Sequence, residues 1–280
     1  MLKKRIIFTL LYDQGTFVLS RNFRLQKVGD LRWLKENYDF SRVAFSIDEL
    51  IILDISRGDR DEEKFLKHVS SLSEECFIPV AAGGGIRNIE QARQLLYSGA
   101  DKIVVNSLLS NDEDVIQEIA FEFGWQCLVF SVDVKRTKDG LRCFIENGTI
   151  MLKTSLPEYL KKIQLLPIGE LYLNSIDRDG TGQGYDYDLL DALPNPTHNP
   201  VIIAGGVGKD AHLIEGLNDD RVDAVATAHL FNFVGDGLIN ARNTLYKTGM
   251  NLAKWDIQTS MNLKNCLEGI GDNKTIEKII

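Results

Sequence analysis

The sequence PVAAGGGI at residues 79–86 has a counterpart in the second half of the chain, PVIIAGGV at residues 200–207. A second pair follows them: GADKIVVNS at residues 99–107 resembles RVDAVATAH at residues 221–229. Self-similarity at a fixed spacing is the signature of a duplicated structural unit. The sequence therefore predicts two equivalent halves, each with an apolar strand that leads into a glycine-rich loop.

Eight short apolar runs occur along the chain, and longer amphipathic stretches separate them. The runs are continuous rather than alternating, which is typical of parallel strands covered on both faces. They lie at residues 5–11, 49–55, 78–82, 102–106, 127–132, 170–174, 201–204 and 223–226. Helices are expected at residues 88–98 and 111–123 and from a start at Ser155, three residues before Glu158.

Eight strand–helix units in two halves predict an α/β fold, a single (β/α)8 TIM barrel with a two-fold half-barrel repeat. An open, doubly wound sheet is the alternative. We assign residues 1–255 to the barrel and residues 256–280 to a short C-terminal extension, either helical or disordered.

The composition excludes several classes of protein. With 44% hydrophobic residues over 280 positions, the chain can bury a large core, and its formal net charge of −8 argues against a dedicated nucleic-acid binder. The four cysteines form no C-x-x-C pair and the four histidines show no ligand spacing, so we expect no metal site and a reduced, cytoplasmic protein. The basic start and residues 6–12 mimic a signal peptide but lack a cleavage site, and no run is long enough to cross a membrane.

Two phosphate-binding loops are predicted at the carboxyl ends of the strands. Glycine lets the backbone approach a phosphate closely, and the next helix start offers free N–H groups. The first loop set is Gly84, Gly85, Asn106 and Ser107; the second is Asp179, Gly180, Gly205, Gly206, Thr227 and Ala228. Two such sites in symmetric half-barrels suit a substrate with a phosphate at each end, although single glycine pairs also occur in plain turns.

Asp133 ends the fifth predicted strand and is the candidate acid or base, because residues there point into the mouth of a barrel. The alternative is a salt bridge to Lys135 or Arg136. The position equivalent to Asp133 in the first half is Leu11, so a symmetric pair of acids is missing. Asp13 lies two residues further on, about 6 to 7 Å along a strand, and is a second, weaker catalytic candidate.

Four charged residues, Arg5, Glu49, Lys102 and Glu170, begin predicted strands. Strand starts converge at the floor of a barrel, and buried charges need partners of opposite sign. We therefore expect a ring of ion pairs at the floor. Either it closes the barrel structurally or it is a gate through which a small polar molecule enters from below.

With these motifs, the chain resembles the cyclase subunit of imidazole glycerol phosphate synthase (HisF) over about residues 2–255. The resemblance rests on RII at 5–7, LDIS at 53–56, GGGI at 83–86, GADK at 99–102, NSIDRDGT at 174–181 with GYD at 184–186, and AGGVGK at 204–209. It implies a lyase of histidine biosynthesis that receives ammonia from a glutaminase (HisH-like) partner and joins it to a ribulosyl bis-phosphate, without metal or organic cofactor. It also implies that the four floor charges form the ammonia gate.

Three positions depart from the family pattern: Leu11 stands where an essential Asp is expected, Leu19 where a Lys is expected, and His229 where a Ser is expected. Leu10-Leu11 and the stretch 28–30 are instead similar to diverged second copies of this subunit in surface-polysaccharide (lipopolysaccharide) gene clusters. That resemblance implies an ammonia-conducting barrel in a glutamine-dependent amidotransferase complex, with an ATP-dependent sugar amidotransferase as a further partner and an acetamidino sugar as product. The alternatives are an active cyclase that uses Asp13, and a non-catalytic scaffold that binds a phosphorylated metabolite.

Overall fold

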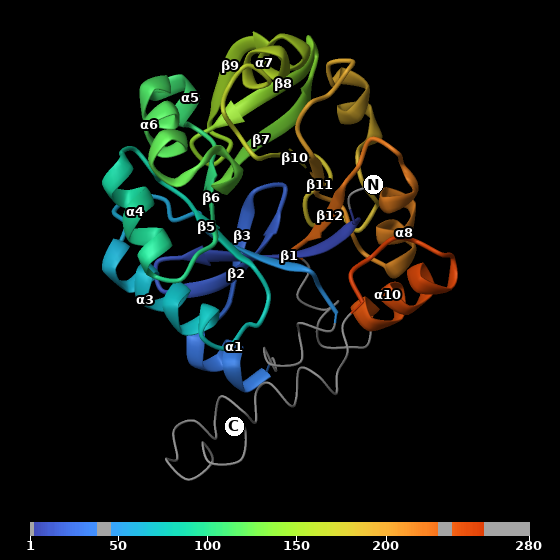
Figure 1. Cartoon of the computed structure of the whole chain (residues 1–280), viewed down its shortest axis with the longest axis horizontal. Helices are drawn as coiled ribbons and strands as arrows, with labels where there is room; N and C mark the ends of the chain where they lie inside the picture. The colour runs from blue at the N-terminus through green and yellow to red at the C-terminus, as the bar shows by residue number, and fades with distance from the viewer. Residues whose placement is uncertain (1–2, 38–45, 229–236, 255–280) are drawn as a thin grey trace, which may run out of the picture.

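Eight parallel strands form a closed barrel in the computed structural model, which describes residues 3–37, 46–228 and 237–254. The predicted barrel is therefore confirmed, and the open sheet is wrong because parallel pairing runs all the way round (Figure 1). In order around the barrel the strands are β1 (Arg5–Asp13), β4 (Glu49–Asp54), β5 (Val80–Gly83), β6 (Lys102–Val105), β7 (Leu128–Thr137), β10 (Glu170–Ser175), β11 (Val201–Ala204) and β12 (Ala224–Thr227).

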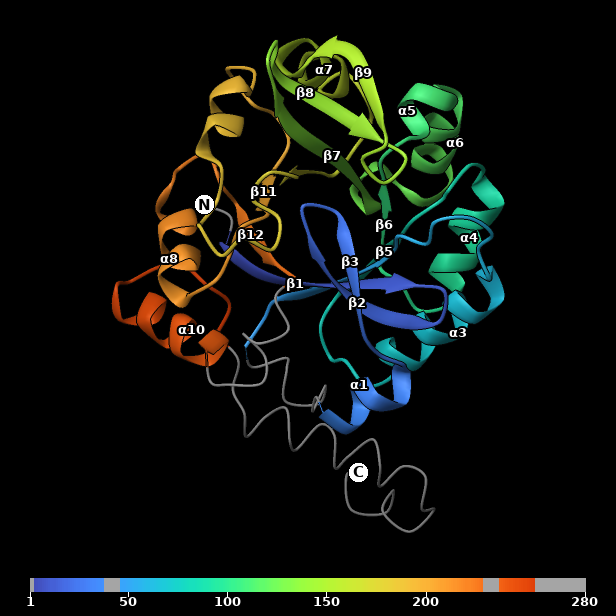
Figure 2. The same ribbon diagram turned by 180° about the vertical axis from the view of Figure 1, so that it is seen from behind.

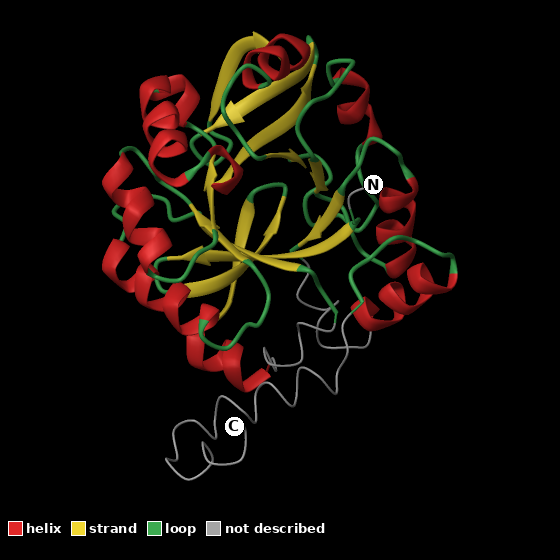
Figure 3. Ribbon diagram, in the orientation of Figure 1, coloured by secondary structure: helices red, strands yellow, loops and turns green. Residues whose placement is uncertain are grey.

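Helices surround the strands on the outside (Figure 3). They are α1 (Leu31–Asn37), α3 (Glu62–Ser73), α4 (Ile89–Tyr97), α5 (Leu108–Asn111), α6 (Glu113–Phe123), α7 (Leu156–Ile163), α8 (Asp210–Asn218) and α10 (Gly237–Lys247), with 3-10 turns η1 (Trp125–Cys127) and η2 (Tyr187–Ala192). The helix predicted at 88–98 begins after Asn88, whose side chain accepts from Gln91 N. The one predicted at 111–123 is divided into α5 and α6 at Asp112, and α7 begins with a Ser155–Glu158 capping box.

Two hydrophobic clusters form the core. The larger one lies between strands and helices and includes Phe8, Ile52 and Leu189. The smaller one contains Ile7, Ile51, Val104 and Tyr172. Because side chains alternate across a strand, this second set comes from the opposite faces of the strands and fills the inside of the barrel. The continuous apolar runs follow from this burial on both faces.

Two β-hairpins lie at the carboxyl ends of the strands, and the sequence analysis did not predict them. β2 (Thr16–Arg21) and β3 (Arg24–Gly29) follow β1, while β8 (Gly140–Ile145) and β9 (Ile150–Ser155) follow β7 (Figure 2). Their turns place Asn22, Phe23, Glu146 and Asn147 at positive φ. Left-handed residues of this kind match the twist of paired strands. The hairpins also explain why β1 and β7 run beyond their predicted ends.

A buried ion pair lies at the amino-terminal end of the barrel strands, opposite the hairpins. Arg242 of α10 donates to Asp48, before β4, through Nη1 at 2.9 Å and Nη2 at 2.7 Å. Both side chains are buried, so the pair links the last described helix to the second barrel strand. No helix in the described part of the chain has the length and apolar character needed to span a membrane. The predicted extension at residues 256–280 lies outside the described residues.

Candidate functional site

A cavity of about 650 Å³ lies at the carboxyl ends of the barrel strands. Both glycine loops line it, from opposite halves of the barrel. All the predicted phosphate-binding residues belong to its wall: Gly84, Gly85, Asn106, Ser107, Asp179, Gly180, Gly205, Gly206, Thr227 and Ala228. The structure therefore brings the two halves of the predicted site into one space, while phosphate binding itself stays a prediction.

The two loops need glycine for the same steric reason. Gly84 has φ +116°, and a Cβ there would lie 2.0 Å from the carbonyl oxygen of Asp54. Gly206 has φ +106°, and a Cβ there would lie 2.1 Å from the carbonyl oxygen of Gly184. Each loop thus packs against its neighbour so closely that no side chain fits. The repeated glycines are required by the fold and also leave backbone exposed to the cavity.

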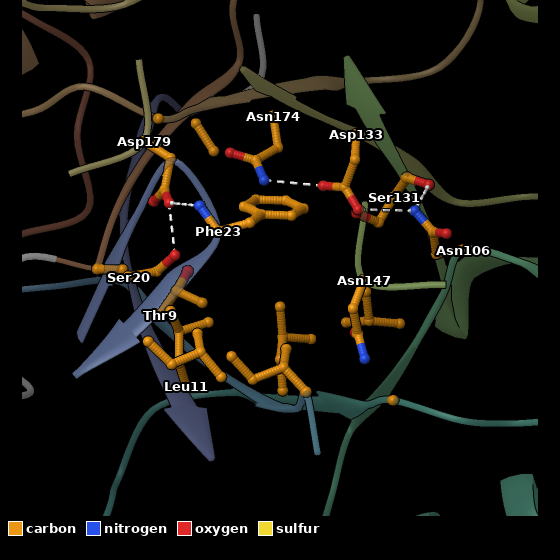
Figure 4. Close-up of a pocket in the computed structure, with 18 of the residues that line it drawn as sticks. Thr9, Leu11, Ser20, Phe23, Asn106, Ser131, Asp133, Asn147, Asn174 and Asp179 are labelled. Atoms are coloured by element: carbon orange, nitrogen blue, oxygen red, sulfur yellow. Dashed lines mark hydrogen bonds between the residues drawn. The ribbon is translucent and has the colours of Figure 1, made fainter. Parts of the chain in front are cut away.

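Asp133 lines the cavity and is held by two amides (Figure 4). Its Oδ1 accepts from Asn174 Nδ2 at 2.8 Å and its Oδ2 from Asn106 Nδ2 at 3.1 Å. Burial raises the pKa of Asp133 to about 6, although the hydrogen bond from Asn174 favours the charged form. A carboxyl with this pKa can accept or donate a proton near neutral pH. The alternative salt bridge is not formed: Arg136 pairs with Asp186 and Asp188 instead.

Leu11 lines the same cavity and lies across it from Asp133 in the view of Figure 4. The side of the cavity that faces Asp133 is therefore apolar at this point. Leu19, the second departure, also lines the cavity. Asp13 does not: it lies at the end of β1, where its carbonyl accepts from Thr16 Oγ1 at 2.9 Å in the hairpin turn. His229, the third departure, lies outside the described residues.

Asp179 holds the first hairpin over the cavity. Its Oδ2 accepts from Ser20 Oγ at 2.5 Å and from the backbone N–H of Phe23 at 3.0 Å. Asn22 adds bonds to the carbonyls of Ile176 and Asp177. Figure 4 shows the Phe23 ring pointing into the cavity. The carboxylate of Asp179 thus fixes the position of the β2–β3 hairpin through two hydrogen bonds, which the sequence analysis did not predict.

Five arginines in the cavity wall were also missed. They are Arg21, Arg24, Arg57, Arg60 and Arg87. Arg87 forms an ion pair with Glu146 at 2.7 Å, and Arg57 donates to the carbonyl of Phe23 at 2.5 Å. Arg57, Arg60 and Arg87 all follow the carboxyl ends of strands. Because such residues lie at the mouth of a barrel, their positions in the sequence could have indicated that they line the cavity.

The four floor charges meet as predicted at the amino-terminal end of the barrel. Arg5 Nη1 lies 2.8 Å from Glu49 Oε2 and 2.9 Å from Glu170 Oε1. Lys102 Nζ lies 2.9 Å and 3.1 Å from the same two oxygens. Each cation therefore contacts both carboxylates, and the four residues close into a ring.

The ring leaves two oxygens available. Glu49 Oε1 and Glu170 Oε2 are buried and have no hydrogen-bond partner. Burial raises the pKa of Glu49, whereas Lys102 and Arg5 act in the opposite direction. For Arg5 the attraction of Glu170 and Glu49 outweighs burial, and its pKa is raised. The floor thus carries strong charges together with unused acceptor atoms.

Between the floor and the cavity, the inside of the barrel is narrow. Tyr172 Oη and Thr9 Oγ1 lie 3.3 Å apart, and both side chains are buried. Both residues also line the cavity. Elsewhere inside the barrel, β5, β11 and β12 contribute the small side chains of Ala81, Ala204, Ala224 and Ala226. In the described residues, no cluster of three or more histidine, cysteine or acidic side chains has the arrangement of a metal site.

Comparison with known proteins gives consistent results. Residues 31–235 match the model of the histidine biosynthesis protein family. A relative from Parasynechococcus marenigrum with the provisional name imidazole glycerol phosphate synthase subunit hisF2 is 47% identical over 93% of this chain and 97% of its own length. Imidazole glycerol phosphate synthase subunits HisF from Clostridium botulinum and Pelodictyon phaeoclathratiforme are 37% and 36% identical, each over 90% of this chain and 99% of their own length.

Proposed function

Because this chain belongs to the histidine biosynthesis protein family, as a diverged second copy of the HisF subunit of imidazole glycerol phosphate synthase, we propose that it conducts ammonia from a HisH-like glutaminase. In this proposal ammonia enters through the floor ring, passes along the inside of the barrel and leaves at the cavity. The observation that carries the proposal is the closed ring of Arg5, Glu49, Lys102 and Glu170 with two unpartnered carboxylate oxygens.

The ring suits this role better than a purely structural one. A structural cluster is most stable when every buried acceptor oxygen has a donor, and two oxygens here have none in the described protein. Ammonia or ammonium has N–H groups that would satisfy these oxygens. Displacing one lysine would then open a path, because Lys102 bridges Glu49 and Glu170 across the ring.

The face around the ring supports a protein partner. Large apolar side chains are exposed at the loops that lead into the strand starts. They are Phe77, Tyr97, Phe121, Trp125 and Leu165. Phe77 and Leu165 follow α3 and α7, Tyr97 ends α4, Phe121 lies in the last turn of α6 and Trp125 begins η1. These segments lead into β5, β10, β6 and β7, so the five side chains lie on one part of the amino-terminal rim of the barrel. Exposed aromatic and aliphatic groups of this kind mark interaction sites, and we assign them to the glutaminase.

We further propose that the ammonia serves an ATP-dependent sugar amidotransferase that makes an acetamidino sugar in the cytoplasm. The support is Leu11, which places a methyl-bearing side chain where the cyclase reaction requires a titratable one. The cyclase chemistry would then be lost while conduction is kept. Cys76, Cys127 and Cys143 are free thiols, which agrees with a reducing compartment.

The decisive experiment supplies amide-¹⁵N glutamine to the barrel–glutaminase pair, together with the sugar amidotransferase, ATP and an N-acetyl sugar. Excess unlabelled ammonium is present in solution. Channelling predicts ¹⁵N in the amidino product despite the unlabelled pool. Product that carries only unlabelled nitrogen, at a wild-type rate of glutamine hydrolysis, would contradict conduction.

Lys102→Met tests the path, with Lys67→Met on the outside of α3 as the matched control. The ring variant should lower ¹⁵N incorporation while glutamine is still hydrolysed, because Met keeps most of the volume of the Lys102 side chain in the ring but loses the ammonium group that contacts both carboxylates. The control should behave as wild type. Equal incorporation in both variants would return the ring to a structural role. A glutaminase that neither binds the barrel nor is activated by it would leave the scaffold hypothesis.

A second candidate is an active cyclase, and the intact cavity with Asp133 at a pKa of about 6 favours it. The test is turnover of the ribulosyl bis-phosphate with ammonium alone. Turnover that Asp133→Asn abolishes would establish the cyclase and remove the premise that Leu11 has silenced the reaction. Absence of turnover, with glutaminase binding intact, supports conduction to another acceptor.

A further inference from the structure

Arg60 lies against the first glycine loop of the cavity. A Cβ built on Gly85 would come within 2.2 Å of Arg60 Nη1 and 2.7 Å of Cζ. The guanidinium therefore occupies the space directly beside the Gly85 backbone. It is also part of the cavity wall, together with Gly84, Asn106 and Ser107.

The charges around this loop favour an anion. Five arginines and four carboxylates (Asp54, Asp133, Glu146 and Asp179) line the cavity, and no lysine or histidine does among the residues described. The lining is thus positive by one charge, 5 − 4, in a chain whose formal net charge is −8. Charged clefts with low-dielectric walls concentrate ligands of opposite sign.

The guanidinium of Arg60 is poorly used by the protein itself. Its ion pair is with Asp54, where Nε lies 3.5 Å from Oδ2, too far for a good hydrogen bond. Its Nε is buried and has no hydrogen-bond partner. Arg87 and Arg57, by contrast, donate to Glu146 and to the carbonyl of Phe23. Arg60 therefore has donor capacity left, beside a glycine loop that lines the cavity.

We propose that Arg60 is the cation of the first loop and binds the phosphate-monoester end of a phosphorylated sugar. The phosphate would lie against the Gly84–Gly85 backbone and the Asn106 and Ser107 side chains, and Arg60 would neutralise its charge. A planar guanidinium is suited to two phosphate oxygens at once. The inference goes beyond ammonia conduction and rests on the prediction that the first glycine loop binds phosphate.

The experiment uses the full chain labelled with ¹⁵N-glycine, which gives at most 23 amide signals. Inorganic phosphate and ribose 5-phosphate are titrated, with ribose as the uncharged control. The signals of Gly84 and Gly85 report the first loop, and those of Gly205 and Gly206 report the second. We compare Arg60→Met, Arg60→Lys and Asp54→Asn with Arg93→Gln, a control on the outer helix α4.

Arg60→Met should weaken binding at Gly84 and Gly85 by about ten- to a hundredfold, the range for a hydrogen bond to a charged group. Binding at Gly205 and Gly206 should be unchanged, and Arg60→Lys should be intermediate. Asp54→Asn should keep or strengthen binding, because it removes a negative charge and leaves the guanidinium. Ribose should shift none of these four signals. The Arg93→Gln variant should bind both phosphate probes as wild type does.

Three other outcomes would overturn the inference. If Arg60 only supports Asp54, then Asp54→Asn and Arg60→Met will weaken binding alike. If Arg60→Met leaves the midpoint at Gly84 and Gly85 within about twofold, well inside the loss expected of a charged hydrogen bond, Arg60 is not a ligand. If wild type shows no shift with either phosphate probe, the cavity binds no phosphate and the predicted phosphate-binding loops fail together with the inference, whereas ammonia conduction and glutaminase binding are untouched by this test.

Discussion

Replacing Lys102 by Met removes the ammonium group from the floor ring but keeps most of the side-chain volume. Glu49 loses its 2.9 Å contact with Lys102 and Glu170 loses its 3.1 Å contact with Lys102. Arg5 is then the only cation of the ring that both carboxylates contact. Removing one partner of a buried ion pair costs about 3 to 5 kcal/mol, because the remaining charge stays uncompensated. We take the lower end, about 3 kcal/mol, because the side chains of Lys102 and Arg5 are still 18% and 21% exposed, so water weakens their ion pairs.

The assay is denaturant and thermal unfolding of the full chain. A loss of about 3 kcal/mol corresponds to a fall in Tm of roughly 5 °C for a domain of this size. Lys67→Met breaks an exposed pair on α3 and should cost less than about 1 kcal/mol. Adding Glu49→Gln to Lys102→Met should recover about 1 to 3 kcal/mol relative to the sum of the single changes. A Lys102→Met variant as stable as Lys67→Met would refute the reasoning that the ring is a mutually dependent, buried unit.

Three further predictions concern the cavity and the closing ion pair. Leu11→Asp should introduce ribulosyl bis-phosphate turnover with ammonium, measurable as product formation, because it places a titratable group across the cavity from Asp133; unchanged inactivity would show that other features block the reaction. The carboxyl of Asp133 should titrate near pH 6 in carbon-detected NMR. Because its pKa in the folded protein is raised from 3.8, the protonated group contributes stability at low pH, and this contribution is lost as the pH rises from about 4 to 6. The Asp133→Asn variant should not show that loss of stability. Arg242→Met should lower the free energy of unfolding by about 3 to 5 kcal/mol in chemical denaturation, because it leaves Asp48 charged and buried, and a loss below 1 kcal/mol would contradict that account.

Much of the fold could be predicted from local patterns. The apolar runs at 5–11 and 49–55 became β1 and β4 because burial on both faces demands continuous apolar residues. The hairpins were missed because their strands are half-exposed and their turns use Phe23 and Glu146, which seldom adopt positive φ. Asn147-Gly148 is a turn dipeptide that could have indicated the second hairpin.

The barrel, the equivalence of its two halves and the positions of Gly84, Gly206 and Asp133 around one cavity could be inferred from the sequence, because periodicity and strand ends are local properties. The floor ring was also foreseen, but the contacts of the charged residues around the cavity follow from tertiary packing. Asp179, whose phosphate binding stays a prediction, accepts from Ser20 of the first hairpin, and Arg60 lies beside Gly85. Such contacts join segments far apart in the chain, and their geometry depends on how loops pack after the barrel has closed.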